Sequence, residues 1–382
     1  MTFDWRLICS ACDAESVADG LPTVCACGAP WLVRYARQPD PALRAALAAR
    51  PATMWRYREW LPILPGETQA TLGEGMTPLV RVPALERSLG LSAVWIKDEA
   101  QNPTGSFKAR GMAAAVTRAA AAGARRFTVP TAGNAGVALA AYGARAGCAV
   151  RVYAPRSTPP RLLEQVGVHG GELIVADGHI GDCGRASRAW ATETGAFDMS
   201  TLREPYRIEG KKTLGLEIAE QMGWDLPDVI VYPTGGGTGL IGMWKAFDEL
   251  RATGWLGPDA RPMLVSVQAA GCAPVVRAFE RGAAVTEPWP DPATAASGLR
   301  VPGPLGGPLI LRALRETAGR AVAVPDDRLL AAAARLAATE GLDVCPEGGA
   351  AVAALETLVR DGHVPAGARA VVFNTGAGWL YR

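Results

Sequence analysis

The chain has 382 residues, of which 49% are hydrophobic and 20% are charged, and its formal net charge is +2. The length suits two domains of ordinary size and a short appendage, and the composition is that of a folded α/β protein rather than a disordered chain. The nearly balanced charge, without a basic cluster among aromatic residues, argues against nucleic acid and anionic membranes as partners.

The same sequence predicts a cytoplasmic protein. No apolar run approaches the ~20 residues of a membrane span, and residues 1–6 lack the basic and apolar segments of a secretory leader. The eight cysteines are scattered over a long chain, which favours reduced thiols. The three histidines do not lie beside a candidate nucleophile, so a hydrolytic triad is not expected.

Residues 1–37 carry two cysteine pairs, Cys9 with Cys12 and Cys25 with Cys27. Paired cysteines around a short loop predict a small knuckle that holds a structural zinc ion through four thiolates. The second pair has C-x-C spacing, tighter than the usual C-x-x-C, so a ribbon that has kept its thiols without binding metal remains the alternative.

Residues 38–98 form an arm rich in proline and aromatic side chains, followed by the start of a large lobe. Trp55, Tyr57 and Trp60 are expected to cover the main body of the protein or a partner subunit. A strand is predicted over residues 93–97. The segment NPTGSFKARG (residues 102–111) follows, with Ser106 as the predicted N-cap of a helix that contains Lys108.

Residues 99–205 are predicted to form a small lobe in which strands and helices alternate with the spacing of a parallel sheet. Residues 206–382 are predicted to form a large lobe with further strands over 228–232, 263–267, 321–324 and 370–374. The expected fold class is therefore α/β, with parallel-rich sheets flanked by helices, two lobes and the small cysteine segment.

Lys108 is the first candidate for chemistry. The positive end of a helix dipole disfavours an ammonium group in the first turn by roughly 0.3–1 kcal/mol. A neutral amine is what attack on an aldehyde requires, and a tuned amine can also move protons. The alternative is a lysine that extends into solvent.

Three strand ends carry further candidates. Gly235-Gly236-Gly237-Thr238-Gly239 separates a buried strand from a helix, the place where backbone N–H groups bind a phosphate, although a tight turn is the alternative. The Thr131–Gly136 loop offers Asn134, and the last strand leads into Thr375. Because such loops meet at one edge of an α/β sheet, a lysine, a phosphate cradle, an amide and a hydroxyl together suggest pyridoxal 5′-phosphate as the cofactor.

With these motifs the chain resembles the fold-type II pyridoxal-phosphate enzymes, the tryptophan synthase beta-like family, and among them the threonine synthases. The resemblance covers residues 70–382. It rests on residues 102–111, on YRIEGKKT (residues 206–213), on the triple-glycine loop and on FNTG (residues 373–376). It implies a homodimer that acts on a small phosphorylated amino acid.

The resemblance also implies roles for individual residues. Lys108 would form the internal aldimine and move protons, Asn134 would bind the 3′-oxygen of the cofactor, and Thr375 would face its pyridine nitrogen. The cofactor phosphate would be held by Gly235, Gly236, Gly237, Thr238 and Gly239. The substrate would be held by Thr131, Gly133, Arg207 and Lys211, with a solvated charged patch as the alternative for Arg207 and Lys211.

The implied reaction converts O-phospho-L-homoserine and water to L-threonine and phosphate. Several residues depart from the commoner pattern of the family, namely Ala109, Ala135, Leu202 and Trp379-Leu380. These departures leave the cofactor site intact, but they leave more than one amino-acid substrate open. One alternative is a threonine or serine dehydratase or a β-replacement enzyme that acts on a related amino acid. Another is a binding protein without catalytic activity.

Overall fold

The computed structural model describes residues 4–37 and 39–382. Two expectations fall partly outside this range: the absence of a leader, which involves residues 1–3, and the beginning of the arm at residue 38. Among the described residues, no helix is long and apolar enough to cross a membrane.

The chain folds into two compact units, each assembled from more than one segment of the sequence. The first comprises residues up to Met76, Asn102–Thr104 and Lys108–Thr213. The second comprises Thr77–Gln101, Gly105–Phe107 and Leu214–Arg382. Lys108 therefore belongs to the first unit, and the residues directly before it belong to the second.

The first unit begins with a three-stranded antiparallel sheet in the order β2-β1-β3, which carries the cysteine segment. An irregular arm with short helical turns follows. Trp55, Tyr57 and Trp60 are buried there, which confirms that these aromatics serve packing. The elements are β1 (Trp5–Cys9), β2 (Glu15–Val17), β3 (Trp31–Tyr35), α1 (Leu43–Ala46), η1 (Leu47–Ala49) and η2 (Met54–Trp60).

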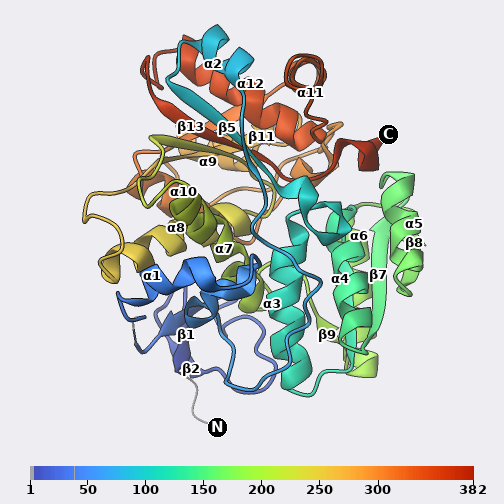
Figure 1. Ribbon diagram of the computed structural model, residues 1–382. Helices are drawn as coiled ribbons and strands as arrows, with labels where there is room; N and C mark the ends of the chain where they lie inside the picture. Colours follow the sequence, from blue (N-terminus) through green and yellow to red (C-terminus); the bar gives the residue numbers. More distant parts are fainter. Residues whose placement is uncertain (1–3, 38) are drawn as a thin grey trace. The chain divides into compact units, whose positions relative to one another are not determined.

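The rest of the first unit is a four-stranded parallel sheet in the order β8-β7-β6-β9, as the alternation of strands and helices predicts. Helices α4 and α6 pack against β6 and β7 (Figure 1). The elements are α3 (Lys108–Ala121), β6 (Arg126–Pro130), α4 (Asn134–Arg145), β7 (Ala149–Pro155), α5 (Pro160–Val168), β8 (Glu172–Ala176), α6 (Ile180–Thr194), β9 (Phe197–Asp198) and α7 (Tyr206–Gln221), whose last turns enter the second unit.

The second unit is built on a six-stranded sheet in the order β12-β11-β10-β13-β5-β4. Only β4 runs antiparallel to its neighbour. Figure 1 shows α11 and α12 on one side of this sheet and α8 and α10 on the other. The first elements are β4 (Leu79–Arg81), α2 (Pro83–Leu89), β5 (Ala93–Asp98), η3 (Glu99–Gln101), β10 (Val229–Pro233), α8 (Thr238–Ala252) and β11 (Met263–Ala269). They are followed by α9 (Pro274–Glu280), η5 (Ser297–Leu299), α10 (Gly307–Glu316), β12 (Arg320–Val324), α11 (Asp326–Glu340), α12 (Pro346–Arg360), β13 (Arg369–Asn374) and η6 (Gly378–Tyr381).

The core of the second unit explains why these strands read as continuous apolar runs. All five residues of β10 are buried, because helices cover both faces of the sheet. Val231 and Val265 from neighbouring strands pack in one cluster with Val352 and Leu355 of α12. Helices α11 and α12 approach closely at Gly349, where an added Cβ would lie 2.2 Å from the backbone oxygen of Leu329.

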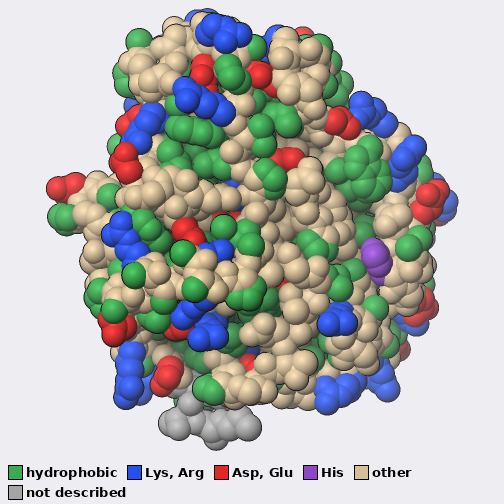
Figure 2. All heavy atoms as spheres, viewed as in Figure 1, with side chains coloured by type: hydrophobic (Ala, Val, Ile, Leu, Met, Phe, Trp, Pro, Cys, Tyr) green, Lys and Arg blue, Asp and Glu red, His purple; other side chains and the backbone are tan. Residues whose placement is uncertain are grey.

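The surface carries both signs of charge. Lys and Arg side chains are interspersed with Asp and Glu side chains over the face shown in Figure 2. This agrees with the nearly neutral formal charge of the sequence.

Candidate cofactor and substrate site

Lys108 is the first residue of α3, as the sequence predicts, and its side chain is half-buried. The predicted N-cap is wrong. Ser106 instead forms a β-bridge with Gly376, and its buried Oγ has no hydrogen-bond partner among the described residues. The next residue is also tied to this strand end, since the N–H of Phe107 donates to the carbonyl oxygen of Thr375 over 3.1 Å.

The glycine-rich loop connects β10 to the N-terminus of α8. Gly237 is the N-cap residue, with φ of 83°, a conformation that favours glycine. A Cβ at Gly239 would lie 2.0 Å from Oη of Tyr232, so this position also excludes a side chain. The first turn of α8 has no acidic residue. Its open N–H groups and the positive end of its dipole therefore suit an anion.

The ring of Tyr232 connects this loop to the residues before Lys108. It packs edge-on against Phe107, with ring centroids 6.0 Å apart, and against Phe373 at 5.0 Å. Strands β10 and β13 are parallel neighbours, so the glycine loop and Thr375 leave the sheet at the same edge. The second unit thus brings the glycine loop, Thr375 and the segment before Lys108 together.

Thr375 is buried, and its side chain contacts a residue that the sequence analysis did not single out. Its Oγ1 lies 3.7 Å from Sγ of Cys345, the N-cap residue of α12. Burial raises the pKa of the Cys345 thiol, and the charge of Glu347 raises it further. Cys345 is therefore a neutral thiol beside the Thr375 hydroxyl.

Glu347 is a second residue near Thr375 that was not predicted from the sequence. Its Oε1 accepts a hydrogen bond of 2.7 Å from the N–H of Gly298, whose carbonyl oxygen would lie 2.3 Å from a Cβ added at Gly235. Its buried Oε2 has no partner among the described residues. The only signal in the sequence is an acidic residue in the first turn of a helix, which is too common to mark a site.

In the first unit, the loop before α4 places the second group of predicted residues. Thr131 is buried, and its Oγ1 accepts a hydrogen bond of 3.0 Å from the N–H of Gly133. Gly133 has φ of 138°, and a Cβ there would lie 2.5 Å from Leu162. Asn134 follows as the first residue of α4. The loop thus needs glycine where the backbone turns into the helix.

Arg207 lies at the same edge of the four-stranded sheet. Its Nη1 donates a hydrogen bond of 2.7 Å to the carbonyl oxygen of Met199, directly after β9, the parallel neighbour of β6. Its Nε is buried without a partner in the described part of the chain. The side chain is only 1% exposed, so a solvated patch is ruled out for this residue.

Glu204 supports Arg207 from the segment just before α7. Its carboxylate accepts hydrogen bonds from the N–H groups of Tyr206 and Arg207, at 2.7 and 3.1 Å. Burial raises the pKa of Glu204 to about 7, although the charge of Arg207 opposes this rise. Burial also lowers the pKa of the Arg207 guanidinium.

Lys211, one turn further along α7, is fully buried beside α3. A Cβ at Gly111 would lie 3.0 Å from Cε and 3.4 Å from Nζ of Lys211. Gly111 is three residues after Lys108 and therefore on the same side of α3. The solvated alternative is wrong for Lys211 as well.

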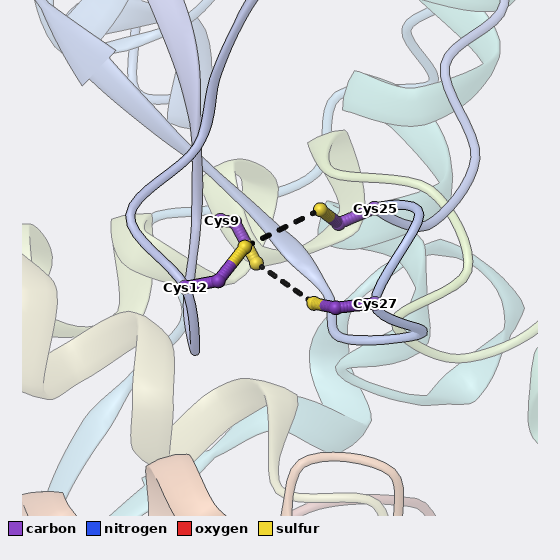
Figure 3. A group of neighbouring side chains, drawn as sticks. All are labelled: Cys9, Cys12, Cys25 and Cys27. Carbon is purple, nitrogen blue, oxygen red and sulfur yellow. Dashed lines mark hydrogen bonds between the residues drawn. The ribbon is translucent and has the colours of Figure 1, made fainter.

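The four cysteines of the N-terminal segment lie at the end of β1, in the turn after it and in the loop before β3, and they point toward one another (Figure 3). Sγ of Cys9 lies 3.4 Å from that of Cys27, and Sγ of Cys12 lies 3.7 Å from that of Cys25. Burial raises the pKa of Cys9, but hydrogen bonds from Ala11, Cys12 and Cys27 outweigh this effect and lower it to about 6. Four sulfur atoms within 4.8 Å of one another form a candidate metal centre.

These features test whether the residues suit pyridoxal phosphate. The N-terminus of α8 suits its phosphate, and Thr375 offers a hydroxyl at the same edge of the sheet. The orphaned Oγ of Ser106 and Oε2 of Glu347 are buried polar atoms that a bound polar ligand would satisfy. The residues present therefore fit this cofactor.

Comparisons with known proteins identify the family. Residues 70–376 match the family described as pyridoxal-phosphate dependent enzyme. The threonine synthase of Methanocaldococcus jannaschii is 33% identical over 373 residues, which cover 97% of this chain and 91% of that protein. The threonine synthase of Mycobacterium tuberculosis is 35% identical over 330 residues, which cover 86% of this chain and 88% of that protein.

Solved structures support the fold. The structure of maize serine racemase aligns with a TM-score of 0.67 and 21% identity, covering 90% of this chain and 94% of that one. The chain belongs to the family of pyridoxal-phosphate dependent enzymes that includes the threonine synthases.

Proposed function

We propose that the protein is a pyridoxal-phosphate dependent lyase that converts O-phospho-L-homoserine and water to L-threonine and phosphate. The observation that carries the proposal is the position of the segment before Lys108, which is hydrogen-bonded to Thr375 and packed against the strand before the glycine loop. Relatives that are named threonine synthase over most of the chain support this choice of reaction.

The cofactor residues are assigned as the family resemblance implies. Bound pyridoxal phosphate supplies an aldehyde that condenses with amines and a ring that withdraws electrons from an adjacent carbon. Lys108 provides the amine, and Asn134 binds the 3′-oxygen. The loop Gly235, Gly236, Gly237, Thr238 and Gly239 holds the phosphate, and Thr375 faces the ring nitrogen.

Residues of the first unit would hold the substrate. Arg207 has a buried N–H group that is not used within the described chain, and such a group suits a phosphate oxygen. Thr131 and Gly133 lie after β6 at the same sheet edge, and Lys211 adds a second buried cation on α7. We therefore assign the substrate phosphate to Arg207 and Lys211, with Thr131 and Gly133 beside it.

Lys108 would move the protons. Its free amine would remove a proton from Cα and then one from Cβ, and phosphate would leave from Cγ. The amine would return one proton to Cγ and one to Cα. The hydroxyl of water would add at Cβ, and the second water proton would go to the released phosphate. Each step requires a lysine that can change its charge, which the first turn of a helix favours.

A dehydratase is the competing assignment. The test incubates the purified protein and pyridoxal phosphate with O-phospho-L-homoserine and, separately, with L-threonine. Release of phosphate together with L-threonine supports the proposal. Formation of 2-oxobutanoate from L-threonine, without phosphate release from O-phospho-L-homoserine, would replace it with a dehydratase.

For Cys9, Cys12, Cys25 and Cys27 we propose a structural zinc ion. Tetrahedral Zn–S bonds of ~2.3 Å place sulfur atoms ~3.8 Å apart. This is close to the 3.4 and 3.7 Å between the two sulfur pairs that dashed lines join in Figure 3. The test compares the zinc content of the wild-type protein with that of the Cys12→Ser/Cys27→Ser variant, using Cys183→Ser as a control. About one zinc ion per chain, lost only in the double variant, is expected. If the wild-type protein contains no zinc even when it is produced in medium with zinc, the four cysteines form a metal-free ribbon instead.

The resemblance also leads us to propose a cytoplasmic homodimer. One chain has a mass of 39.9 kDa. Light scattering of the protein loaded with pyridoxal phosphate should give twice this mass. The mass of a single chain would contradict the dimer without affecting the proposed reaction.

A further inference from the structure

A chain of buried polar side chains lies behind Thr375 in the second unit. Asp98 ends β5, Asn374 ends the neighbouring strand β13, and Cys345 caps α12. Nδ2 of Asn374 donates to Oδ1 of Asp98 over 2.8 Å. Sγ of Cys345 lies 3.3 Å from Oδ1 of Asn374 and 3.7 Å from Oγ1 of Thr375. The chain ends at the residue assigned to the cofactor ring nitrogen.

Asp98, at one end of this chain of side chains, fixes which group donates in each hydrogen bond. A carboxylate can only accept, so the amide of Asn374 must turn its NH₂ group toward Asp98. The amide oxygen of Asn374 therefore faces Cys345, where it also accepts from the backbone N–H over 3.2 Å. Because an amide oxygen can only accept, the thiol proton of Cys345 must point toward Asn374.

The thiol keeps this proton. Its side chain is fully buried, which raises its pKa, and the nearby charge of Glu347 acts in the same direction. The sulfur also accepts a hydrogen bond of 3.3 Å from the N–H of Gly348 in the first turn of α12. The sulfur atom is thus held in one place, and it contacts Oγ1 of Thr375 at 3.7 Å without offering it a proton.

We propose that Cys345 is a positioning residue for the Thr375 hydroxyl: its sulfur packs against Oγ1, and Asp98, through Asn374, keeps the thiol proton turned away from it. Since the thiol proton is committed to Asn374, it does not occupy the lone pairs of Thr375 Oγ1. Thr375 keeps its own proton for the ring nitrogen. The inference rests on the proposed function, in which Thr375 faces that nitrogen.

A double-mutant cycle tests this in the protein loaded with pyridoxal phosphate. Cys345→Ala, Thr375→Val and the double variant are compared by cofactor dissociation constant and by the ¹⁵N NMR shift of ¹⁵N-labelled cofactor. Cys345→Ala should weaken cofactor binding roughly threefold to tenfold and move the ring-nitrogen signal. In the Thr375→Val background it should change neither, because the hydroxyl that it positions is gone.

The control is Cys183→Ala, which removes a buried thiol from α6 and should leave both readouts unchanged. Equal effects of Cys345→Ala in both backgrounds would overturn the inference, because they would show a purely structural role. The absence of any effect in the wild-type background would overturn it as well.

A second experiment tests the direction of the hydrogen bonds. Asn374→Asp sets two carboxylates against each other and should weaken cofactor binding. Asp98→Asn/Asn374→Asp restores a donor and an acceptor between the two strands, so the double variant should recover most of the affinity. A double variant that is folded by circular dichroism but binds no better than Asn374→Asp contradicts the fixed direction. If the double variant is unfolded, the double-mutant cycle of Cys345→Ala and Thr375→Val decides whether Cys345 positions the hydroxyl.

These outcomes are separable from failure of the proposed function. A wild-type protein that binds no pyridoxal phosphate would refute the proposed function itself. A wild type that binds the cofactor, with additive effects of Cys345→Ala and Thr375→Val, would refute only the role of Cys345.

Discussion

The N–H of Phe107 donates a hydrogen bond to the carbonyl oxygen of Thr375, with 3.1 Å between nitrogen and oxygen. This bond ties the residue before Lys108 to the end of the last strand of the six-stranded sheet. The aromatic ring of Phe107 meets Tyr232 on the strand that leads into the glycine loop. The lysine thus follows a segment that is fixed against two of the predicted ligand-binding loops.

Replacing Lys108 by alanine should abolish catalysis while the fold persists. We expect the rate of product formation to fall by more than ~10³-fold, because no other amine in the first turn of α3 can take its role. The measurement is phosphate release together with the visible absorbance of the bound cofactor. Lys245→Ala, which removes a lysine paired with Glu249 on α8, serves as the control. Comparable losses in both variants would contradict a specific role for Lys108.

The glycine loop should not tolerate a methyl group at Gly239. The added Cβ would lie 2.0 Å from Oη of Tyr232, whose ring is held between Phe107 and Phe373 and cannot easily move. Gly239→Ala should therefore weaken cofactor binding by roughly tenfold or more, the effect of about 1.4 kcal/mol. Equilibrium titration with pyridoxal phosphate measures this.

Gly257→Ala is the matched control, since nothing lies within 4 Å of its added Cβ. Unchanged cofactor affinity in Gly239→Ala would show that the loop does not hold the phosphate.

A buried ion pair in the second unit should be important for stability. Nζ of Lys97 lies 3.0 Å from Oε2 of Glu217, and neither side chain is exposed. Glu217→Ala leaves a buried ammonium without its counter-charge and should lower the free energy of unfolding by about 3–5 kcal/mol. Urea denaturation measures the loss, and Glu356→Ala on α12 is a more exposed control. A loss below about 1 kcal/mol would contradict the role of the pair.

Glu204 should make stability depend on pH. Burial raises its pKa to about 7 in the folded protein, against about 4.3 for an unfolded glutamate. Its contribution to stability is therefore complete below pH ~4.3 and is lost as the pH rises through about 7. The free energy of unfolding of the wild type, minus that of Glu204→Gln, should fall by ~3 kcal/mol over this range.

Denaturation series at several pH values measure this difference, with exposed Glu193→Gln as the control. A difference that stays constant with pH would show that Glu204 does not titrate in this window.

Local patterns explain what could be predicted from the sequence. The apolar strand before the glycine loop, the alternation of strands and helices, and the helix at Lys108 each depend on neighbouring residues, and each is present in the structure. The lobe boundaries predicted near residues 99 and 206 remain predictions.

Contacts between distant segments explain what was missed. Ser106 looks like an N-cap because a helix follows, but pairing with Gly376 places it in a bridge instead. The polar motif at the start of α7 resembles a solvated patch, yet Arg207 and Lys211 are buried. Cys345 lies 30 residues before Thr375 in the chain, and only the packing of α12 brings the thiol to the hydroxyl.

The central claim is that Lys108 carries the cofactor, and chemical trapping tests it most directly. Borohydride reduction of the protein loaded with pyridoxal phosphate fixes the cofactor to its lysine, and peptide mass spectrometry then locates the modified residue. We predict the adduct on Lys108. An adduct on Lys97, Lys211, Lys212 or Lys245 instead, or no adduct on any lysine, would contradict the account.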